Sequence, residues 1–516
     1  MIGHHPLLAR IFHELLSRDH EDGRATGQPS RGTAGLVRGV PKRYVAGADT
    51  RGRQEGRPYP WSQQVIHEIS GLGEIGCPFC MYRVRRGKRW WPIMSDLLNK
   101  ALRYRWLVFW VLAFSYILVY FHRLCPAVVA VDMMRDLQAG GTLLGLLSSA
   151  YFYPYALMQL PAGLLSDSWG PRRSITLFFS VATIGSIVLG LAPSAFWAIV
   201  GRTLVGLGVA MLFVPTMKVL AEWFRVREFA TMTAILMVMG GLGSLTAATP
   251  LALLSNWIGW RFSFVAVGVF TMVMAILVWL FVRDRPADLG WPSPAESVGS
   301  SPPSIGLLEG MRRVLTYPRF WPVAIWFFFD CAVFFSFGGL WGGPYLMQVY
   351  GLTKTQAGHI LSMLAIGMIV GSPLLSFLSN RIFQGRKPVM VLSSFIVVCL
   401  TALLAFYTDG LPIAVLYLIC LGLGMFSSAI VVIGFTTTKE LFPVQIAGTS
   451  TGLVNLFPFA GGAIFQPLLG YVLERAGRVG TAFALSGYKQ AFLILFVCGL
   501  ISFLACLFLK ETLVRE

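Results

Sequence analysis

Twelve long apolar segments, separated by polar loops, constrain this 516-residue chain more than any other feature. A helix needs about 20 apolar residues to cross a bilayer, and each segment is about that long. Backbone groups in lipid must bond within their own segment, and these segments lack the alternation of barrel strands, so we expect helices. The predicted spans are 106–131, 141–165, 174–192, 196–221, 229–255, 261–282, 320–349, 356–380, 388–407, 412–437, 446–473 and 485–509.

The charged residues indicate how the chain is oriented. They make up 13% of the chain, against about 25% in an ordinary soluble protein, which excludes a soluble enzyme. The net charge of +18 does not indicate a nucleic-acid partner, because the basic residues cluster in alternate loops between spans. The positive-inside rule then predicts a multi-pass protein of the inner (plasma) membrane, with the lipid bilayer as partner and both termini in the cytoplasm.

A loop rich in proline and serine divides the spans six and six. We therefore expect an all-α membrane protein with twelve transmembrane helices in two pseudo-symmetric six-helix bundles. The predicted bundles cover 94–282 and 320–516, with a cytoplasmic linker at 283–319. Lys218 and Glu222 end one predicted helix, and Lys439 and Glu440 end its counterpart in the second half. Related halves of this kind are typical of secondary transporters.

Residues 1–93 are basic and lack an apolar span. We interpret them as a disordered extension, or as sequence upstream of a true start at Met94. Cys77 and Cys80 form a lone C-x-x-C pair, which is weak evidence for a metal. The chain has no phosphate-binding G-x-x-x-x-G-K-[ST] sequence. We predict no cofactor, no metal and no catalytic residues, so the chain is not expected to be an enzyme.

Two motifs resemble those of the major facilitator superfamily. Residues 163–173 read GLLSDSWGPRR and residues 202–208 read RTLVGLG, which are similar to the family's G-x-x-x-D-x-x-G-x-[RK]-[RK] and R-x-x-x-G-x-G signatures. The resemblance covers about 100–512 and implies the major facilitator fold. The second half has only a worn copy of the first motif, with Asn380 in place of the aspartate. In the fifth helix Thr249 precedes Pro250 where the family's antiporters have Gly-Pro, which weakly disfavours a drug–proton antiporter.

The resemblance also implies roles for charged residues at the cytoplasmic helix ends. Asp167 is expected to pair with Arg172 or Arg173 in a cluster that closes the inward-facing gate, and Arg202 to serve helix packing and gating. Lys218 lies four residues before Glu222, so we expect those two to pair on one helix face. The gating charge cluster predicted in this way comprises Asp167, Arg172, Arg173, Glu222 and Arg225.

Four charges stand out inside predicted spans, where an ionised side chain is costly and marks a functional candidate: Arg202 and Lys218, discussed above, and Arg123 and Asp330. Arg123 is expected to bind a substrate anion, because its planar fork suits a carboxylate or phosphate; pairing with Asp330 or a place at the membrane interface are the alternatives. Asp330 is expected to couple protons or hold a substrate amine; a structural ion pair is the alternative. Glycines beyond Asp330 predict that this helix is interrupted. The other predicted substrate-binding residues are Tyr151, Tyr155, Gln159, Trp341, Tyr345 and Asn455.

These features predict a secondary active transporter that works by alternating access. Short stretches such as 120–123 and 452–455 look like bacterial carriers near the organic-anion, organophosphate and lysosomal dipeptide branches. The expected substrate is a small polar metabolite: an organic anion, an amino acid or a short peptide, with protons as the candidate coupling ion. One alternative is an organophosphate–phosphate exchanger, which the lack of a cation on the seventh helix disfavours. Another is a non-transporting membrane sensor of the same fold.

Overall fold

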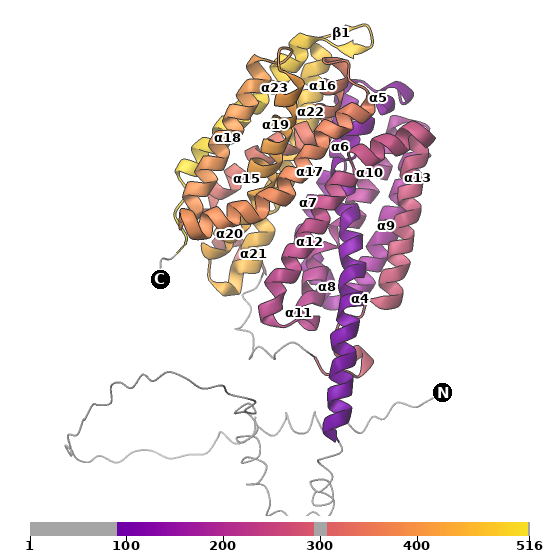
Figure 1. Cartoon of the computed structure of the whole chain (residues 1–516), viewed down its shortest axis with the longest axis vertical. Helices are drawn as coiled ribbons and strands as arrows, with labels where there is room; N and C mark the ends of the chain where they lie inside the picture. The colour runs from indigo at the N-terminus through magenta and orange to yellow at the C-terminus, as the bar shows by residue number, and fades with distance from the viewer. Residues whose placement is uncertain (1–89, 294–306, 514–516) are drawn as a thin grey trace, which may run out of the picture. The chain divides into compact units, whose positions relative to one another are not determined.

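The computed structural model describes residues 90–293 and 307–513. The predicted extension as far as residue 89, with its Cys77–Cys80 pair, and residues 294–306 of the predicted linker lie outside these ranges. Within the described ranges the chain is built of helices joined by short loops, apart from one small antiparallel hairpin. Figure 1 shows the helices of the first half gathered beside those of the second half.

The N-terminal half of the structure comprises the helices from α4 to α13 (Figure 1). The first helix begins at Trp90 and is continued beyond Cys125 by a shorter helix. A 3-10 turn, η3 (Pro286–Leu289), follows the last helix. The helices of this half are α4 (Trp90–Leu124), α5 (Pro126–Asp136), α6 (Gly141–Ser149), α7 (Phe152–Leu157), α8 (Gln159–Trp169), α9 (Pro171–Gly190), α10 (Ala195–Ala210), α11 (Phe213–Trp223), α12 (Val226–Thr246) and α13 (Thr249–Phe281).

The C-terminal half follows a short helix, α14 (Leu307–Leu315). It contains three π-helical turns, η4 (Phe337–Trp341), η5 (Leu378–Ile382) and η6 (Gly424–Ala429), and the hairpin β1 (Arg478–Val479) with β2 (Ala482–Phe483). Its helices are α15 (Phe320–Ser336), α16 (Gly342–Gln348), α17 (Lys354–Phe377), α18 (Arg386–Phe406), α19 (Ile413–Leu423), α20 (Val431–Glu440), α21 (Val444–Val454), α22 (Leu456–Arg475) and α23 (Leu485–Leu507).

Eleven helices in the described ranges are long and apolar enough to cross a membrane. The second predicted span, 141–165, is the one missing from that set, because it is broken into the short helices α6, α7 and α8. The fifth and sixth predicted spans meet within α13, where the backbone leaves helical geometry at Gly259 (φ 78°). A positive φ is easily adopted by glycine, so this residue marks the boundary that the sequence places between 255 and 261. The twelve-helix arrangement is therefore consistent with the structure.

Where the sequence predicts an interruption of the seventh span, the structure has a π-helical turn, and the helical span continues from Phe320 to Gln348. Helix α15 changes into η4 at Phe337, which alters the hydrogen-bond pattern of the backbone. The side-chain amide of Gln466, on α22, donates to the carbonyl oxygen of Phe335 at 2.8 Å. The indole of Trp341 in turn donates to the backbone carbonyl of Gln466 at 2.9 Å. Helix α22 thus stabilises the irregular part of the neighbouring helix.

The two ends of the helical bundles differ in sequence, and we name them by their loops. The motif end carries the loops at 170, 224–225, 282–285 and 383–385, beside the arginine-rich motifs. The hairpin end carries the loops at 137–140, 191–194 and 407–412 and the strands β1 and β2. Helices α4, α8 and α11 reach the motif end, whereas α5 contacts α16, α6 and α13 near the hairpin end (Figure 1).

The halves are joined by polar contacts at the hairpin end. Lys354 of α17 forms an ion pair with Asp132 of α5 and donates to the hydroxyl of Ser255 at 3.1 Å. Asn256 donates to Thr355 at 3.1 Å. In the described ranges, every hydrogen bond or ion pair between the halves lies at this end or in the middle of the bundles, so the structure is closed at the hairpin end.

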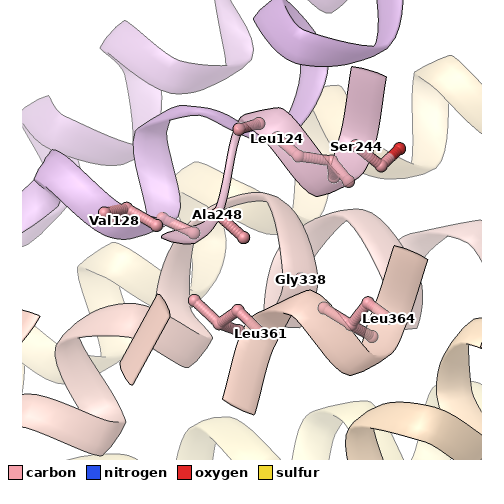
Figure 2. A pocket seen from close by; sticks show the side chains of 9 residues that line it. Leu124, Val128, Ser244, Ala248, Gly338, Leu361 and Leu364 are labelled. Atoms are coloured by element: carbon pink, nitrogen blue, oxygen red, sulfur yellow. The ribbon is translucent and has the colours of Figure 1, made fainter. Parts of the chain in front are cut away.

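Apolar packing completes this closure. Figure 2 shows Leu124 and Val128 of the N-terminal half facing Leu361 and Leu364 of the C-terminal half, with Gly338 between them. The cavity that they enclose measures about 10 Å³, which is room for about one water molecule. Its lining is largely apolar, so it is a packing gap in the closed interface and too small to be a substrate site.

Candidate functional site

Arg123 lies where the two halves meet, surrounded by aromatic rings. Helix α4 supplies both Arg123 and Tyr120, three residues earlier and therefore on the same helix face. The guanidinium carbon lies 4.4 Å from the ring centre of Tyr120 and 5.1 Å from that of Tyr155. The C-terminal half contributes Phe459 at 5.0 Å and Phe335 at 5.8 Å. We call these four rings the aromatic cage.

The charge of Arg123 is buried without a carboxylate. Its side chain is 7% exposed, and none of the ion pairs in the described ranges involves it. Its Nε atom has no hydrogen-bond partner among the described residues. Cation–π contacts offset only part of the cost of burying a charge, which is typically several kcal/mol. The alternative in which Arg123 pairs with Asp330 is not formed in this structure.

A second buried arginine is linked to the aromatic cage through two tyrosines. Tyr155 stacks on Tyr151, with ring centres 5.5 Å apart and planes 22° apart. The guanidinium carbon of Arg202 lies 5.2 Å from the ring centre of Tyr151. Arg202 also donates to the backbone carbonyl of His122 at 2.9 Å. Its contacts are with helices of its own half, and its role in packing and gating stays a prediction.

An amide pair joins the halves beside Arg123. The side chain of Asn455 donates to the side-chain oxygen of Gln159 at 2.7 Å. Gln159 in turn donates to the backbone carbonyl of Tyr155, at 3.1 Å. This places Arg123, Tyr155, Gln159 and Asn455 in one connected cluster, together with Tyr151. These are five of the eight substrate-binding residues predicted from sequence.

Asp330 lies apart from this cluster. Its carboxylate is fully buried and accepts a hydrogen bond from Ser427 of η6 at 2.9 Å. The other carboxylate oxygen has no hydrogen-bond partner in the described ranges. The neighbouring indole of Trp326, one turn before Asp330, donates to Ser394 of α18. Asp330 therefore faces the interior of the C-terminal half in this conformation, and it does not share a site with Arg123.

Trp341 and Tyr345 are also separate from Arg123. Both are fully buried near the hairpin end of the C-terminal half. Tyr345 donates to the backbone carbonyl of Thr408 at 2.6 Å and packs against Phe492 with ring centres 4.7 Å apart. Trp341 is held by Gln466, as described above. The sequence places both residues on a helix expected to line the cavity, but it does not show whether their side chains face the cavity or the interior of the half.

At the motif end, Asp167 pairs with Lys218 of α11, and not with Arg172 or Arg173 as the resemblance implies. Its carboxylate lies 2.7 Å from the ammonium of Lys218 on α11. The expected pairing of Lys218 with Glu222 is therefore wrong for this conformation, because the lysine reaches the neighbouring helix instead. Arg172 donates to the backbone carbonyl of Trp279 and stacks on its ring at 4.2 Å.

The remaining members of the predicted gating cluster are not brought together. Arg173 is exposed, and Glu222 and Arg225 are half-buried at the end of the N-terminal half. In the described ranges, the ion pairs of the motif end connect residues of the same half. A cluster that closes this end would form in the opposite conformation, so its role stays a prediction.

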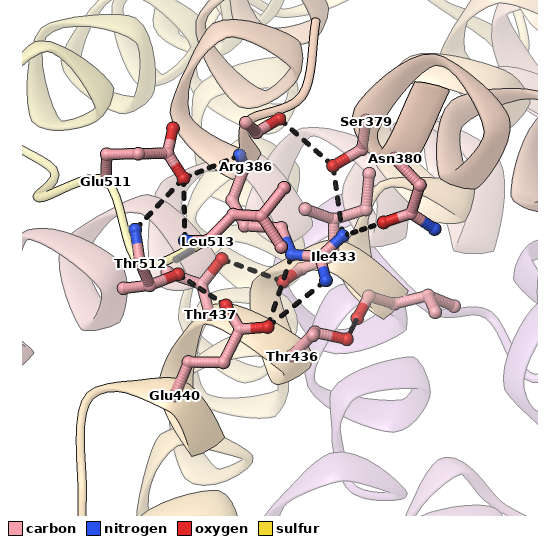
Figure 3. Close-up of polar contacts among 12 residues, drawn as sticks. Ser379, Asn380, Arg386, Ile433, Thr436, Thr437, Glu440, Glu511, Thr512 and Leu513 are labelled. Carbon is pink, nitrogen blue, oxygen red and sulfur yellow. Dashed lines mark hydrogen bonds and ion pairs between the residues drawn. The ribbon is translucent and has the colours of Figure 1, made fainter. Parts of the chain in front are cut away.

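The C-terminal half has a denser cluster at the same end (Figure 3). Arg386 donates to Asn380 at 2.6 Å, to Ser379 at 3.1 Å and to Glu440 at 3.1 Å. Asn380 occupies the aspartate position of the worn motif, and here its amide oxygen accepts from the arginine. Sequence reasoning identified the worn motif but not Glu440 or Glu511 as partners, since they lie 54 and 125 positions away from Arg386.

The sequence model of the Major Facilitator Superfamily matches residues 110–466 and 343–515. A probable sulfoacetate transporter of Cupriavidus necator is 23% identical over 76% of this chain and 92% of that protein. A probable galactarate/D-glucarate transporter of Bacillus subtilis is 24% identical, over 75% and 90%. A probable hexose phosphate transport protein of Chlamydia trachomatis is 24% identical, over 78% and 92%.

Solved structures show the same fold. A bacterial homologue of the human lysosomal transporter Spinster, in an inward-facing and unoccupied conformation, superposes with a TM-score of 0.62 at 20% identity and covers 78% of this chain and 97% of its own. A D-xylose–proton symporter gives a TM-score of 0.63 at 14% identity, covering 79% and 99%. Fold and relatives together define a multi-pass membrane transporter. The chain belongs to the major facilitator superfamily.

Proposed function

We propose that this protein is a secondary active transporter of a small organic anion, and that Arg123 binds the anionic group. One observation carries the proposal: a buried guanidinium at the meeting of the two halves, with no carboxylate paired to it in the described ranges. A planar guanidinium suits a carboxylate, sulfonate or phosphate. The curated relatives named above carry sulfoacetate, sugar diacids or hexose phosphates by their names, and all of these are anions.

The surroundings of Arg123 favour a substrate with hydroxyl or carbonyl groups next to the anion. Gln159 and Asn455 present an amide from each half, and an amide can both donate and accept. A substrate that replaced the bond between them would contact both halves at once. The aromatic cage would cover its less polar face. A substrate bound to both halves at once would couple binding to the movement of the halves in alternating access.

We also propose that protons are coupled through Asp330. A carboxylate that is fully buried in a membrane helix and has a single serine hydroxyl as hydrogen-bond partner is costly to keep ionised. A proton taken up there would remove that cost. The basic loops further suggest that the motif end faces the cytoplasm, so that the described conformation is inward-facing.

The first test is a binding screen with the full-length protein. Sulfoacetate, D-glucarate, galactarate, glucose 6-phosphate, an amino acid mixture and dipeptides are each added, and thermal unfolding is followed. A ligand at 100 times its Kd should add about 2.7 kcal/mol to the stability of the protein. We expect a hit among the carboxylates or sulfonates, and uptake of the same compound by proteoliposomes.

Variants then assign the site. Arg123→Ala should abolish the ligand-induced stabilisation. Arg123→Lys should weaken it, because an ammonium cannot form the bidentate pair of hydrogen bonds that a guanidinium forms with an anionic group. Arg478→Ala is the matched control, since that arginine also stacks on a ring, Phe483, but lies in the exposed hairpin. Asp330→Asn should keep ligand binding and lose the pH dependence of uptake. Unchanged binding in Arg123→Ala would overturn the anion site.

A further inference from the structure

Helix α6 begins without a capping side chain of its own. Its first residue is Gly141 and its N-cap is Gly140, which has no side chain to accept a hydrogen bond from the first turn. The carboxylate of Glu474, at the end of α22 in the other half, takes this role. It accepts from the backbone N–H of Thr142 at 3.0 Å and from the hydroxyl of Thr142 at 2.6 Å. The first turn of a helix in one half is thus capped by the other half.

The sequence around α6 is suited to this borrowed cap. A Cβ atom at position 140 would overlap the carboxylate oxygen of Glu474, so the glycine leaves the space that the carboxylate occupies. Helix α17, which begins at the corresponding point of the second half, has an ordinary cap. There Thr353 and Gln356 form a capping box within the helix itself. Of these two corresponding helices, α6 alone takes its cap from the other half.

Two more helices borrow a carboxylate, but from their own half. At the motif end, Asp284 accepts from the backbone N–H of Arg172 at 2.6 Å, at the start of α9. Glu511 accepts from the backbone N–H groups of Arg386 and Lys387, at the start of α18, at 2.8 and 3.1 Å. These caps need not break when the halves move. The cap from Glu474 must break whenever the hairpin end opens.

A second contact at the hairpin end must also break when this end opens. The ion pair between Lys354 and Asp132 joins α17 to α5, and its side chains are 16% and 18% exposed. Ser255 of α13 accepts from the same ammonium, and Arg135 lies 3.8 Å from Asp132. Parting the halves would separate Lys354 from Asp132, so the attraction within this partly buried ion pair is available to the closed conformation alone.

We propose that Glu474 and Lys354 form a two-point lock that holds the hairpin end closed. Each point stabilises only the closed conformation, so each shifts the equilibrium between the two states of the transporter. The proposal rests on the alternating-access part of the proposed function and is independent of the substrate. Its test uses no ligand, so its failure would leave the anion site untouched, and failure of the anion site would leave the lock untouched.

The test measures the opening of the hairpin end directly. Spin labels are placed at positions 191 and 407, which are 63% and 61% exposed in the loops of the two halves at this end, after replacement of the native cysteines. Double electron–electron resonance in lipid nanodiscs then gives the fractions of closed and open protein. We expect Glu474→Gln and Lys354→Met each to raise the ratio of open to closed protein about fivefold, comparable to the loss of a helix cap. The double variant should approach the product of the two, because the points share no residue.

Asp284→Asn and Glu511→Gln are the matched controls. Each weakens a borrowed cap, but within one half, and is expected to leave the ratio of open to closed protein unchanged. Gly140→Ala provides a second way to displace the carboxylate of Glu474 and should act in the same direction as Glu474→Gln. An unchanged distance distribution in the folded double variant would overturn the lock. An equal shift in Asp284→Asn would overturn it too, because the effect would then be a general loosening of the helices.

Discussion

At the motif end each half ties together its own helices, whereas at the hairpin end the halves are tied to each other. Arg386 and Glu440 form an ion pair within the C-terminal half, as Asp167 and Lys218 do within the N-terminal half. Lys354 instead reaches across to Asp132. The difference teaches that polar contacts in this transporter serve two purposes. Those at the motif end hold a half rigid, and those that cross between the halves at the hairpin end are proposed to select a conformation.

The largest effect is expected from glycines that let the backbones of the halves touch. A Cβ atom at Gly343, on α16, would overlap the backbone carbonyl oxygen of Ala127 on α5. That oxygen belongs to a helix and cannot move aside alone. Gly343→Val should therefore shift nearly all of the protein to the conformation open at the hairpin end, as read from the distance between labels at 191 and 407. Gly448→Val is the control, because a Cβ there meets no atom within 4 Å.

A smaller effect, on stability alone, is expected at the centre of the C-terminal cluster. Arg386→Met removes the hydrogen bonds to Asn380, Ser379 and Glu440. The arginine side chain is only 12% exposed and its hydrogen bonds are charge-assisted, so their loss should cost about 1–3 kcal/mol. The measurement is the apparent Tm in detergent. A large change in the ratio of open to closed protein would contradict the division between the two ends.

The cap on α18 should make stability depend on acid. Burial raises the pKa of Glu511, but hydrogen bonds from the backbone N–H groups of Arg386, Leu513 and Lys387 outweigh it and lower the pKa below its usual 4.5. A carboxyl group whose pKa is lowered on folding stabilises the protein above its unfolded pKa, and this contribution is lost as the pH falls through the folded value. Thermal unfolding between pH 7 and pH 3 should show this loss below about pH 4.5.

Glu511→Gln is the comparison for that pH series. It should lower the stability at pH 7 by about 0.5–1 kcal/mol, since the carboxylate is exposed and its contribution is screened. The difference between the variant and the wild-type protein should vanish at low pH. A difference that stayed constant down to pH 3 would mean that the cap does not depend on the charge.

The smallest effect is expected from restoring the worn motif. Asn380→Asp places a carboxylate 2.6 Å from the guanidinium of Arg386, where an amide oxygen now accepts. A charge-assisted hydrogen bond is stronger than a neutral one, but Glu440 already shares this arginine. We expect a gain of less than about 1 kcal/mol in stability. A loss of stability would show instead that repulsion between the two carboxylates dominates.

Much of the fold could be predicted because membrane spans are a local property of the chain. The apolar segments give the helices, and Gly259 marks the turn between the fifth and sixth spans. The break in the second span was missed. Its turns at Tyr151 and Met158 follow no glycine, and the apolar content of the segment is the same whether or not its helix is continuous.

The sequence identifies some members of the candidate site and not others, for a reason that concerns the direction of side chains. Depth in the membrane can be counted along the sequence, so Arg123 and Asp330 could be identified as buried charges. Whether a residue faces the other half or the interior of its own half depends on the rotation of its helix. No sequence pattern therefore indicates that Phe335 and Phe459 lie beside Arg123 in the aromatic cage. The sequence likewise does not show that Asp330 faces Ser427, away from Arg123.

The sequence by itself determined the class of the protein, the number of spans and the residues whose burial is costly. These properties depend only on the length of each apolar segment and on the charged residues within it. The tertiary structure alone decided which residues meet across long separations. Glu474 and Thr142 are 332 positions apart, and nothing near α6 indicates that its cap comes from the other half. Such contacts arise because the packing of the two bundles brings together helix ends that are distant in the sequence.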